Sequence, residues 1–366
     1  MSSEPGNPAG AGPRWADNRA VRLFGVSYPI VQTGMGWVSG ASLTAATAEA
    51  GGLGILASAT MTLGELDAAI AKVRSRTERP IGVNLLPNQA DLAARISLLE
   101  RTRIPVASFA GAPAKDVVAR LRDAGIVTIV TVGAPRHAEK MAAIGVSAVI
   151  AQGGEGGGHT GTIPSSLLLP GVVDAVAGSD VVVLGAGGVS DGRGLVASLA
   201  YGADGVAMGT RFLLTAESQV PDNVKAIYLA AALTGTVVTS AIDGAPQRVI
   251  RTEVIDGIEA SLPPVRLMRA ARNALRFRSQ TGVGLVELVR TGLAMRRDQE
   301  LTWAQMAMAA NAPMLTKASM VDGHPEVGIL PTGQVVGAIG ELPSVAELIE
   351  RMVAEADDVL RRLGAS

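Results

Sequence analysis

Short apolar runs and helical stretches alternate along most of the chain, and this alternation limits the possible folds more than any other feature of the sequence. About eight such runs lie between Tyr28 and Met208, at positions 28–32, 53–57, 81–86, 106–110, 126–132, 147–151, 181–184 and 205–208. The runs are continuously apolar, which is typical of parallel strands that are covered on both faces. Strands that alternate with helices in this way indicate an α/β fold with a parallel sheet.

Polar residues and glycines recur directly after the predicted strands, at Gln32, Asn84, Gln152, Gly187 and Gly209. In a (β/α)8 barrel the carboxyl ends of all strands meet at one mouth, whereas a doubly wound sheet concentrates its site near one switch point. The spread of these residues over many strand ends favours the barrel. We therefore predict an α/β chain with a (β/α)8 TIM barrel and a smaller helical domain or insert near its C-terminal part.

The predicted domain boundaries follow from changes in this pattern. Residues 1–18 are rich in Gly, Pro, Ser and Ala and predict a disordered tail, and residues 19–248 form the predicted TIM-barrel domain. Strand-like runs vanish over 249–312, which predicts a helical insert or lid. Residues 313–366 are expected to return to the barrel and to end in an amphipathic helix over 343–363.

Two local signals predict where helices begin. Thr62 is followed three residues later by Glu65, which matches a capping box. Asp191 can cap the helical stretch that follows it, because its carboxylate can accept from N–H groups of the first turn.

Composition excludes several classes of function. The formal net charge is -1 and aromatic residues make up 3% of the chain, so we expect neither a nucleic-acid partner nor a membrane partner. The absence of cysteine excludes disulfides, thiolate metal sites and a cysteine nucleophile, and it fits a cytoplasmic location. No His, Asp and Glu spacing matches a metal site. Even the apolar stretch 167–188 is interrupted by Pro170, Asp174 and Asp180, so we expect no transmembrane helix.

The glycine-rich segment Gln152–Gly161 follows a predicted strand and carries one imidazole, His159. Glycines let the backbone approach a ligand without obstruction by a Cβ atom, and bare N–H groups can form an anion site. The alternative is a plain flexible loop, but functional residues lie preferentially on loops that rigid strands hold. Because the sequence offers no nucleophile elbow and no metal triad, we interpret His159 as an acid/base that works beside a cofactor.

Two other glycine-bearing strand ends predict a phosphate site. Gly185–Val189 follows the seventh predicted strand, and Met208–Phe212 follows the eighth. TIM barrels commonly bind phosphate with the loops after these two strands. Tight turns are the alternative interpretation. The glycines at 185 and 187 do not match a dinucleotide-binding fingerprint, because they fall late in the chain and lack its spacing.

Two further groups of polar residues each allow two interpretations. Asn84 and Gln152 end apolar strands, where they can either cap neighbouring backbone or face a ligand with alternating donors and acceptors, such as a flavin ring. A group of arginines at helical spacing is either a solvated helix surface or a basic rim for a phosphorylated substrate tail. These arginines are Arg266, Arg269, Arg272, Arg276 and Arg278.

Several segments carry a resemblance to a known family. Residues 28–32, 51–54, 152–161 and 202–210 resemble the nitronate monooxygenase (2-nitropropane dioxygenase) superfamily, which includes flavin-dependent enoyl-acyl-carrier-protein reductases. The resemblance runs from about Val26 to Leu348. It implies a TIM barrel that binds FMN, with a smaller helical domain over the mouth.

The resemblance also implies roles for individual residues. His159 matches the catalytic base of the family. No residue is implied to bind a metal. The residues implied to line the flavin, contact its ring or hold its phosphate are Gly34, Met35, Asn84, Gln152, Gly157, Gly158, Gly187, Gly188, Gly209, Thr210 and Gln334.

The chain departs from the nitronate-oxidising pattern after the first predicted strand. Oxidising members show a Pro-Met step there, whereas this chain has Thr33–Trp37, which is more similar to the acyl-thioester reductases. Residues 51–61, 153–161 and 300–311 resemble a mycobacterial branch, the flavin oxidoreductases that act on CoA thioesters during steroid ring C/D breakdown.

The resemblance therefore implies an FMN-dependent oxidoreductase that transfers hydride on an acyl-CoA, such as a steroid-derived acid, with His159 as acid/base. The alternatives are a nitronate monooxygenase that oxidises alkyl nitronates with O2, an enoyl-thioester reductase, and a flavin- or phosphate-binding barrel without catalysis. NAD(P)H and O2 are the candidate co-substrates. The final helix could serve a homodimer, although core packing explains it equally well.

Overall fold

The computed structural model describes residues 15–260 and 312–364. The chain divides into two compact units. The barrel unit comprises residues 1–156, 160–219 and 338–366, and the second unit comprises residues 157–159 and 220–337.

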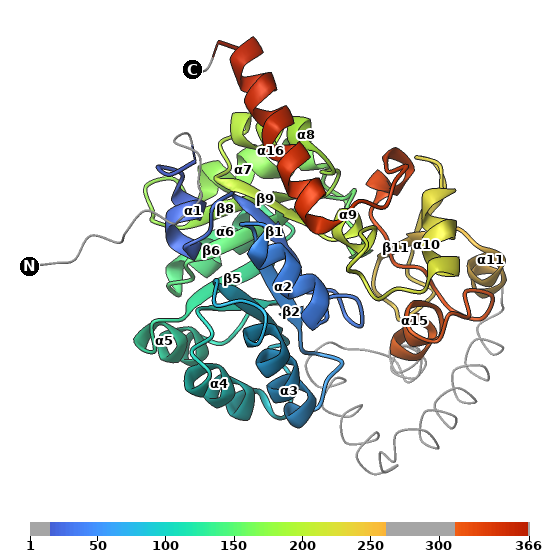
Figure 1. The fold of residues 1–366 in the computed structure, drawn as a ribbon, viewed down its shortest axis with the longest axis horizontal. Coiled ribbons are helices and arrows are strands. Elements are labelled where there is room, and N and C mark those ends of the chain that lie inside the picture. Colours follow the sequence, from blue (N-terminus) through green and yellow to red (C-terminus); the bar gives the residue numbers. More distant parts are fainter. Residues whose placement is uncertain (1–14, 261–311, 365–366) are drawn as a thin grey trace, which may run out of the picture. The chain divides into compact units, whose positions relative to one another are not determined.

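The barrel unit contains a closed barrel of eight parallel strands (Figure 1). The first strand pairs in parallel with both the second and the last, which closes the ring. Each strand coincides with a predicted apolar run, so the predicted TIM barrel is confirmed and the doubly wound alternative is wrong. In barrel order, the strands are β1 (Ile30–Gln32), β2 (Leu53–Ala57), β3 (Ile81–Leu85), β4 (Val106–Phe109), β5 (Val127–Val132), β6 (Ala148–Gln152), β8 (Val182–Ala186) and β9 (Gly205–Met208).

Helices connect successive strands and surround the barrel. Both predicted helix starts are confirmed, since Thr62 and Glu65 form a capping box at α3 and Asp191 accepts from the N–H of Gly194 at α8. These caps satisfy N–H groups that lack an intrahelical partner. Within residues 15–260 and 312–364, no helix combines the length and the apolar character needed to span a bilayer. The connecting helices are α2 (Ala41–Glu49), α3 (Leu63–Arg74), α4 (Leu92–Arg101), α5 (Lys115–Asp123), α6 (Pro135–Ala143), α7 (Ser165–Ala175), α8 (Gly192–Ala200) and α9 (Thr210–Leu213).

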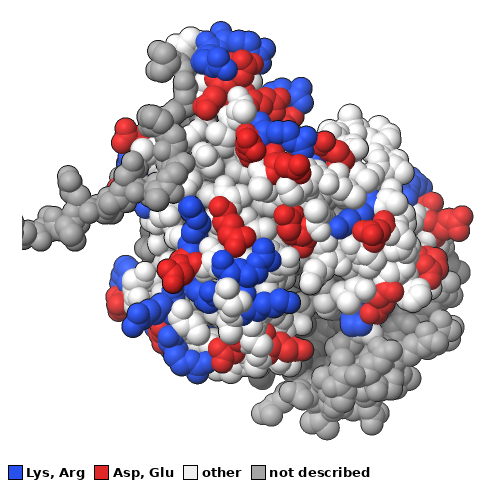
Figure 2. All heavy atoms as spheres, in the orientation of Figure 1, with Lys and Arg blue, Asp and Glu red and all other residues white. Residues whose placement is uncertain are grey.

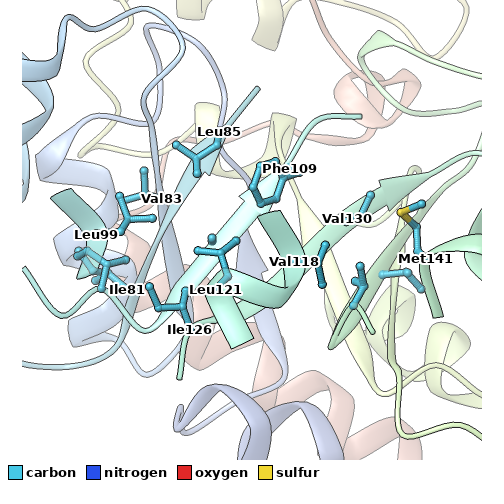
Figure 3. Close-up of a cluster of buried hydrophobic side chains, with 14 of the residues drawn as sticks. Ile81, Val83, Leu85, Leu99, Phe109, Val118, Leu121, Ile126, Val130 and Met141 are labelled. Atoms are coloured by element: carbon cyan, nitrogen blue, oxygen red, sulfur yellow. The ribbon is translucent and has the colours of Figure 1, made fainter. Parts of the chain in front are cut away.

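The strand pleat divides the apolar side chains between two clusters. On β3, Ile81, Val83 and Leu85 pack outside the barrel with helix residues such as Leu99 and Leu121 (Figure 3). Because successive side chains of a strand point to opposite faces, the residues between them face the interior. The interior cluster is filled by Val31, Leu53, Ile55, Val106, Ile129, Ala148, Ile150, Val182, Leu184, Ala186 and Ala207.

A short helix closes the amino-terminal end of the barrel. Phe24 of α1 (Arg19–Phe24) belongs to the interior cluster, together with residues that begin strands, such as Leu53. Residues 15–18 fall in the predicted tail, yet Trp15 is buried and Asn18 caps α1. The carboxyl end of the barrel is therefore the end at which a site can open.

The C-terminal helix α16 (Val345–Arg362) packs against α8 and α2 of the same unit (Figure 1). Its apolar face is buried, as the amphipathic pattern predicts. Gly192, at the start of α8, lies so close to α16 that an added Cβ atom would stand 2.4 Å from the carbonyl oxygen of Met352. The predicted terminal helix is thus confirmed, and its contacts are with the barrel's own helices.

Ion pairs join neighbouring helices of the barrel unit. The hydrogen bond from Arg120 holds the pKa of the Glu100 carboxyl below its usual range. Figure 2 shows positive and negative side chains interspersed on the displayed face, in agreement with the net charge of -1. The pairs are Arg76–Glu49 at 3.3 Å, Arg101–Asp67 at 2.8 Å and Arg120–Glu100 at 2.8 Å.

The second unit is built around a three-stranded antiparallel sheet in the order β10-β11-β7. The central strand β11 (Gln247–Ile250) pairs with β10 (Thr236–Thr239) on one side and with the two-residue strand β7 (Gly158–His159) on the other. Ile242, Val249, Ile255 and Ile329 form its apolar cluster. The other described elements are α10 (Asp222–Leu229), α11 (Glu253–Glu259), α15 (Ala312–Met320) and the 3-10 segment η1 (Gln334–Ala338).

The compact units divide at 219/220 and 337/338, whereas the boundaries predicted from the sequence lie at 248/249 and 312/313. The difference arises because β10 and β11 pair with each other and with β7, and not with the barrel. Most of the predicted helical insert, residues 261–311, lies outside the described residues. The insert therefore stays a prediction.

The close packing of β2 on α2 gives a stability prediction. A Cβ atom at Gly54 would stand 2.2 Å from the backbone carbonyl oxygen of Thr44, so Gly54→Ala should lower the free energy of unfolding by about 1–3 kcal/mol. The matched control is Gly64→Ala, because Gly64 lies in α3 with no atom within 4 Å of its added Cβ. That change should be neutral or stabilise by up to about 1 kcal/mol. Denaturant unfolding of both variants, followed by circular dichroism, measures the difference, and equal effects would contradict the packing argument.

Candidate functional site

Polar side chains replace the apolar ones at the carboxyl end of the barrel interior. Asn84, Thr131 and Gln152 occupy interior positions of β3, β5 and β6, since their strand neighbours pack outside the barrel. The side-chain amide of Asn84 donates to the carbonyl oxygen of Ser108 at 3.3 Å, so part of its hydrogen bonding is to neighbouring backbone. Thr131 was not expected from the sequence, because it lies within an otherwise apolar run. Together these side chains make a polar layer at the mouth.

The turn after β1 lies directly on this layer. A Cβ atom at Gly34 would stand 2.4 Å from the Cβ of Asn84, so only glycine allows the backbone this close. The next residue, Met35, is held by a hydrogen bond from its N–H to Ser39 Oγ at 2.9 Å. An added Cβ at Gly209 would stand 3.2 Å from the sulfur of Met35. The structure thus brings together four of the predicted site residues.

The ends of β8 and β9 form a second part of the mouth. Gly187 and Gly188 have φ values of 97° and 79°, which L-residues with a side chain rarely adopt. In the described part of the chain, their backbone N–H groups donate to no backbone carbonyl. Gly209 and Thr210 begin α9 after the adjacent strand. The N–H groups of Gly187 and Gly188, next to the start of α9, suit an anion.

Within the barrel unit, the glycine-rich segment is held by hydrogen bonds. The N–H of Gly154 donates to the carbonyl oxygen of Ile163 at 2.7 Å, and the Glu155 carboxylate accepts from the N–H and Oγ of Ser165, at 2.9 and 2.8 Å. A Cβ atom at Gly156 would stand 2.6 Å from Nε2 of Gln152. The segment therefore packs on the side chain that ends β6, which argues against a plain flexible loop.

The next three residues, 157–159, belong to the second unit. A Cβ atom at Gly157 would stand 2.4 Å from the backbone N of Gly333, so this glycine marks a close backbone approach. His159 pairs with Gln247 and Gly158 with Arg248 in the antiparallel sheet. His159 thus lies on a short paired strand and not on a free loop.

His159 has a carboxylate partner that the sequence did not reveal. Its Nε2 lies 2.8 Å from Oδ2 of Asp243. Asp243 also accepts from the N–H of Ala245 at Oδ1, 3.1 Å away, and from Nε2 of Gln247 at Oδ2. The two side chains differ in exposure, at 65% for His159 and 9% for Asp243.

Asp243 is ionised at neutral pH. Burial acts to raise the pKa of the Asp243 carboxyl, but the hydrogen bonds from His159, Ala245 and Gln247 outweigh it and hold the pKa below its usual range. No local motif marks Asp243, because it lies 84 residues beyond His159 in the chain. Only the pairing of β7 with β11 indicates that the two are neighbours.

The remaining predicted residues have individual surroundings. Gln334 lies in η1, and its side-chain amide donates to the carbonyl oxygen of Leu233 at 3.4 Å. His137 is exposed on α6, and His324 pairs with Glu326 at 3.1 Å. The arginine group Arg266–Arg278 lies outside the described residues, so its role stays a prediction.

The predicted site residues are divided between the units. Within each unit the structure defines their geometry, and their roles toward a flavin stay predictions. The barrel unit holds Gly34, Met35, Asn84, Gln152, Gly187, Gly188, Gly209 and Thr210, and the second unit holds Gly157, Gly158, His159 and Gln334.

Comparison with protein families agrees with this fold and site. The profile described as "Nitronate monooxygenase" matches residues 17–98 and 91–355. The chain belongs to the nitronate monooxygenase family, and it is an oxidoreductase. The family resemblance predicted from the glycine–histidine segment is thereby confirmed.

Two curated relatives are similar over nearly the whole chain. Each is named "(3aS,4S,5R,7aS)-5-hydroxy-7a-methyl-1-oxo-octahydro-1H-indene-4-carboxyl-CoA dehydrogenase". The protein from Mycobacterium tuberculosis is 55% identical over 334 residues, which cover 91% of this chain and 94% of the relative. The protein from Rhodococcus jostii is 53% identical and covers 94% and 96%. Probable nitronate monooxygenases are less similar, with 30% identity for the Staphylococcus haemolyticus protein over 72% of this chain.

Solved structures show the same similarity in three dimensions. FabK from Thermotoga maritima has a TM-score of 0.75 and 30% identity, and the match covers 94% of this chain and 98% of FabK. A nitroalkane oxidase from Streptomyces ansochromogenes has a TM-score of 0.73 and 30% identity, with coverage of 94% and 99%.

The close approach at Gly157 gives a prediction for the second unit. Gly157→Ala should force the backbone of Thr332 and Gly333 away and lower the thermal unfolding midpoint, with a cost of about 1–3 kcal/mol. Gly161→Ala is the matched control, since the nearest atom to its added Cβ is 3.9 Å away. Differential scanning calorimetry compares the two variants. A midpoint that stays unchanged in Gly157→Ala would show that this contact does not constrain the segment.

Proposed function

We propose that the chain is an FMN-dependent oxidoreductase that transfers hydride on an acyl-CoA thioester, with His159 as acid/base. The observation that carries the proposal is the set of open glycine N–H groups at the ends of β8 and β9 beside the interior amides of Asn84 and Gln152. The names of the two relatives at 55% and 53% identity support a bicyclic, steroid-derived CoA thioester as the substrate class.

The residues of the barrel mouth fit the two ends of FMN. Gly187, Gly188 and Gly209 would bind its phosphate through backbone N–H groups, because an anion is stabilised by donors with no other acceptor. The side-chain amides of Asn84 and Gln152 would face its ring, whose edge presents donors and acceptors. Gly34 would let Met35 approach that ring.

When bound, FMN supplies the centre that accepts or donates the hydride. The chain's own contribution is the matching proton. A hydrogen on the carbon next to a thioester carbonyl is acidic, because the carbonyl stabilises the negative charge left behind. His159 would take that proton when a saturated thioester is oxidised and return it when an unsaturated thioester is reduced. NAD(P)H or O2 would complete the redox cycle and set its direction.

The phosphate part of the proposal predicts a charge effect at Gly188. Asn and Asp are the side chains that best tolerate the positive φ of this position, and they have nearly the same size. Gly188→Asp should weaken FMN binding at least about tenfold more than Gly188→Asn, or about 1.4 kcal/mol, because its carboxylate would repel the phosphate. Fluorescence titration of the apoprotein measures both constants.

Riboflavin provides the control for that titration, since it lacks the phosphate. The difference between Gly188→Asp and Gly188→Asn should vanish with riboflavin. A difference of equal size with both flavins would show that repulsion of the phosphate does not cause it. Purified protein that binds no flavin would overturn the proposed cofactor.

If His159 is the acid/base, its replacement should slow turnover without changing FMN binding. His159→Gln should lower kcat by about 10²–10⁴-fold while the FMN content stays that of the wild type. His137→Gln is the matched control, because His137 is exposed on α6. The assay follows flavin absorbance by stopped flow, with the CoA thioester that appears in the names of the two relatives as substrate. Wild-type rates in His159→Gln would remove this residue from the mechanism.

Nitronate oxidation is the second candidate function. The family match and the structural similarity to a nitroalkane oxidase support it. Oxygen uptake with ethyl nitronate, compared with flavin reduction by the CoA thioester, distinguishes the two. The arginine group Arg266–Arg278 is proposed to bind the CoA phosphates. A homodimer is a further proposal.

A further inference from the structure

We propose that Asp243 is a positioning residue that fixes the tautomer of His159, so that the proton of the neutral imidazole lies on Nε2 and its lone pair on Nδ1. The part of this inference that concerns turnover rests on the proposed function, whereas the part that concerns the tautomer does not. Asp243 lies outside the glycine-rich segment Gln152–Gly161, so the sequence motif does not include it.

The tautomer follows from what each partner can donate. Oδ2 of Asp243 lies 2.8 Å from Nε2 of His159. An ionised carboxylate only accepts hydrogen bonds, so the hydrogen in this contact belongs to the imidazole. In the neutral ring the second nitrogen, Nδ1, then carries the lone pair and is the basic atom.

The carboxylate is itself held in place. Its Oδ1 accepts from the N–H of Ala245 at 3.1 Å, and its Oδ2 also accepts from Nε2 of Gln247. Gln247 is buried and pairs with His159 across the sheet, so β11 supports both members of the pair. With 9% of its side chain exposed, Asp243 has little freedom to turn away from the imidazole.

These contacts determine what an amide at position 243 would do. The backbone N–H of Ala245 can only donate, so it requires an oxygen at the position of Oδ1, whereas the Gln247 amide can turn to present its own oxygen. Asp243→Asn would therefore place its NH2 group at the position of Oδ2, facing His159. Nε2 would then have to accept, and the imidazole proton would move to Nδ1. The lone pair would be displaced to the wrong side of the ring, which in other enzymes has cost up to about 10⁴-fold in kcat.

The experiment uses nitrogen NMR of the full chain labelled with 15N-histidine. Only three histidines are present, so comparison with His137→Gln and His324→Gln assigns the signals of His159. The wild type should show a protonated Nε2 and an unprotonated Nδ1 at His159. Asp243→Asn should reverse this pattern, and Asp243→Glu, which keeps the carboxylate, should restore it.

Turnover is then measured in the same variants. Asp243→Asn should lower kcat by about 10²–10⁴-fold with FMN content and KM nearly unchanged, and Asp243→Glu should recover part of the loss. Asp256→Asn is the matched control, since Asp256 lies in the same unit and pairs with Arg251 at 2.8 Å. It should leave both the spectrum and the turnover unchanged.

Two results would overturn the inference. One is a mixture of tautomers at His159 in the wild type that equals the mixture at the exposed His137. The other is an Asp243→Asn variant with a reversed tautomer and wild-type turnover. Failure of the proposed function is a separate result, since it would appear as full activity in His159→Gln whatever the spectrum of the wild type shows.

Discussion

Closure of the parallel barrel is the constraint on which the rest of the barrel unit depends. Because β1 pairs with both β2 and β9, the carboxyl ends of eight strands are forced to one mouth. The pleat then decides which side chains enter the interior and which pack under the helices. Asn84, Thr131 and Gln152 form one polar layer for this reason, although they come from three different strands. With α1 covering the opposite end, the mouth is the place where this unit can offer polar groups to a ligand.

Close backbone approaches explain several glycines in the two units. Gly34 lies on Asn84, Gly156 on Gln152 and Gly157 on the backbone of Gly333, and in each case a Cβ atom would overlap its neighbour. Packing therefore requires these glycines whatever ligand binds. Gly188 differs from them, because the nearest atom to its added Cβ is 3.9 Å away. Its φ is positive and, in the described part of the chain, its N–H donates to no backbone carbonyl, which suits an anion. A glycine-rich motif thus combines glycines that packing requires with glycines that suit ligand binding. Only the contacts in the structure distinguish the two kinds.

The second unit contains the imidazole of His159. One antiparallel sheet places His159 on β7 beside Gln247 of β11, and the turn before β11 supplies Asp243. The carboxylate is mostly covered and ionised, while the imidazole is largely exposed. This arrangement places a fixed, negatively charged carboxylate beside an exposed imidazole. Similarity to FabK, to a nitroalkane oxidase and to CoA-thioester dehydrogenases agrees with a family in which substrates differ more than the fold.

The sequence by itself determined the barrel, two of its helix starts and the family. Apolar periodicity and the caps at Thr62 and Asp191 are local signals, and each unit of a (β/α)8 barrel pairs with its neighbour in the chain. The tertiary structure alone decided the sheet β10-β11-β7, the limits of the second unit and the partnership of His159 with Asp243. A two-residue strand has no periodicity to detect, and antiparallel pairing between distant segments depends on a register that no local pattern carries. Asn84 and Gln152 of the mouth could therefore be named from the sequence, but Thr131 and the carboxylate partner of the imidazole could not.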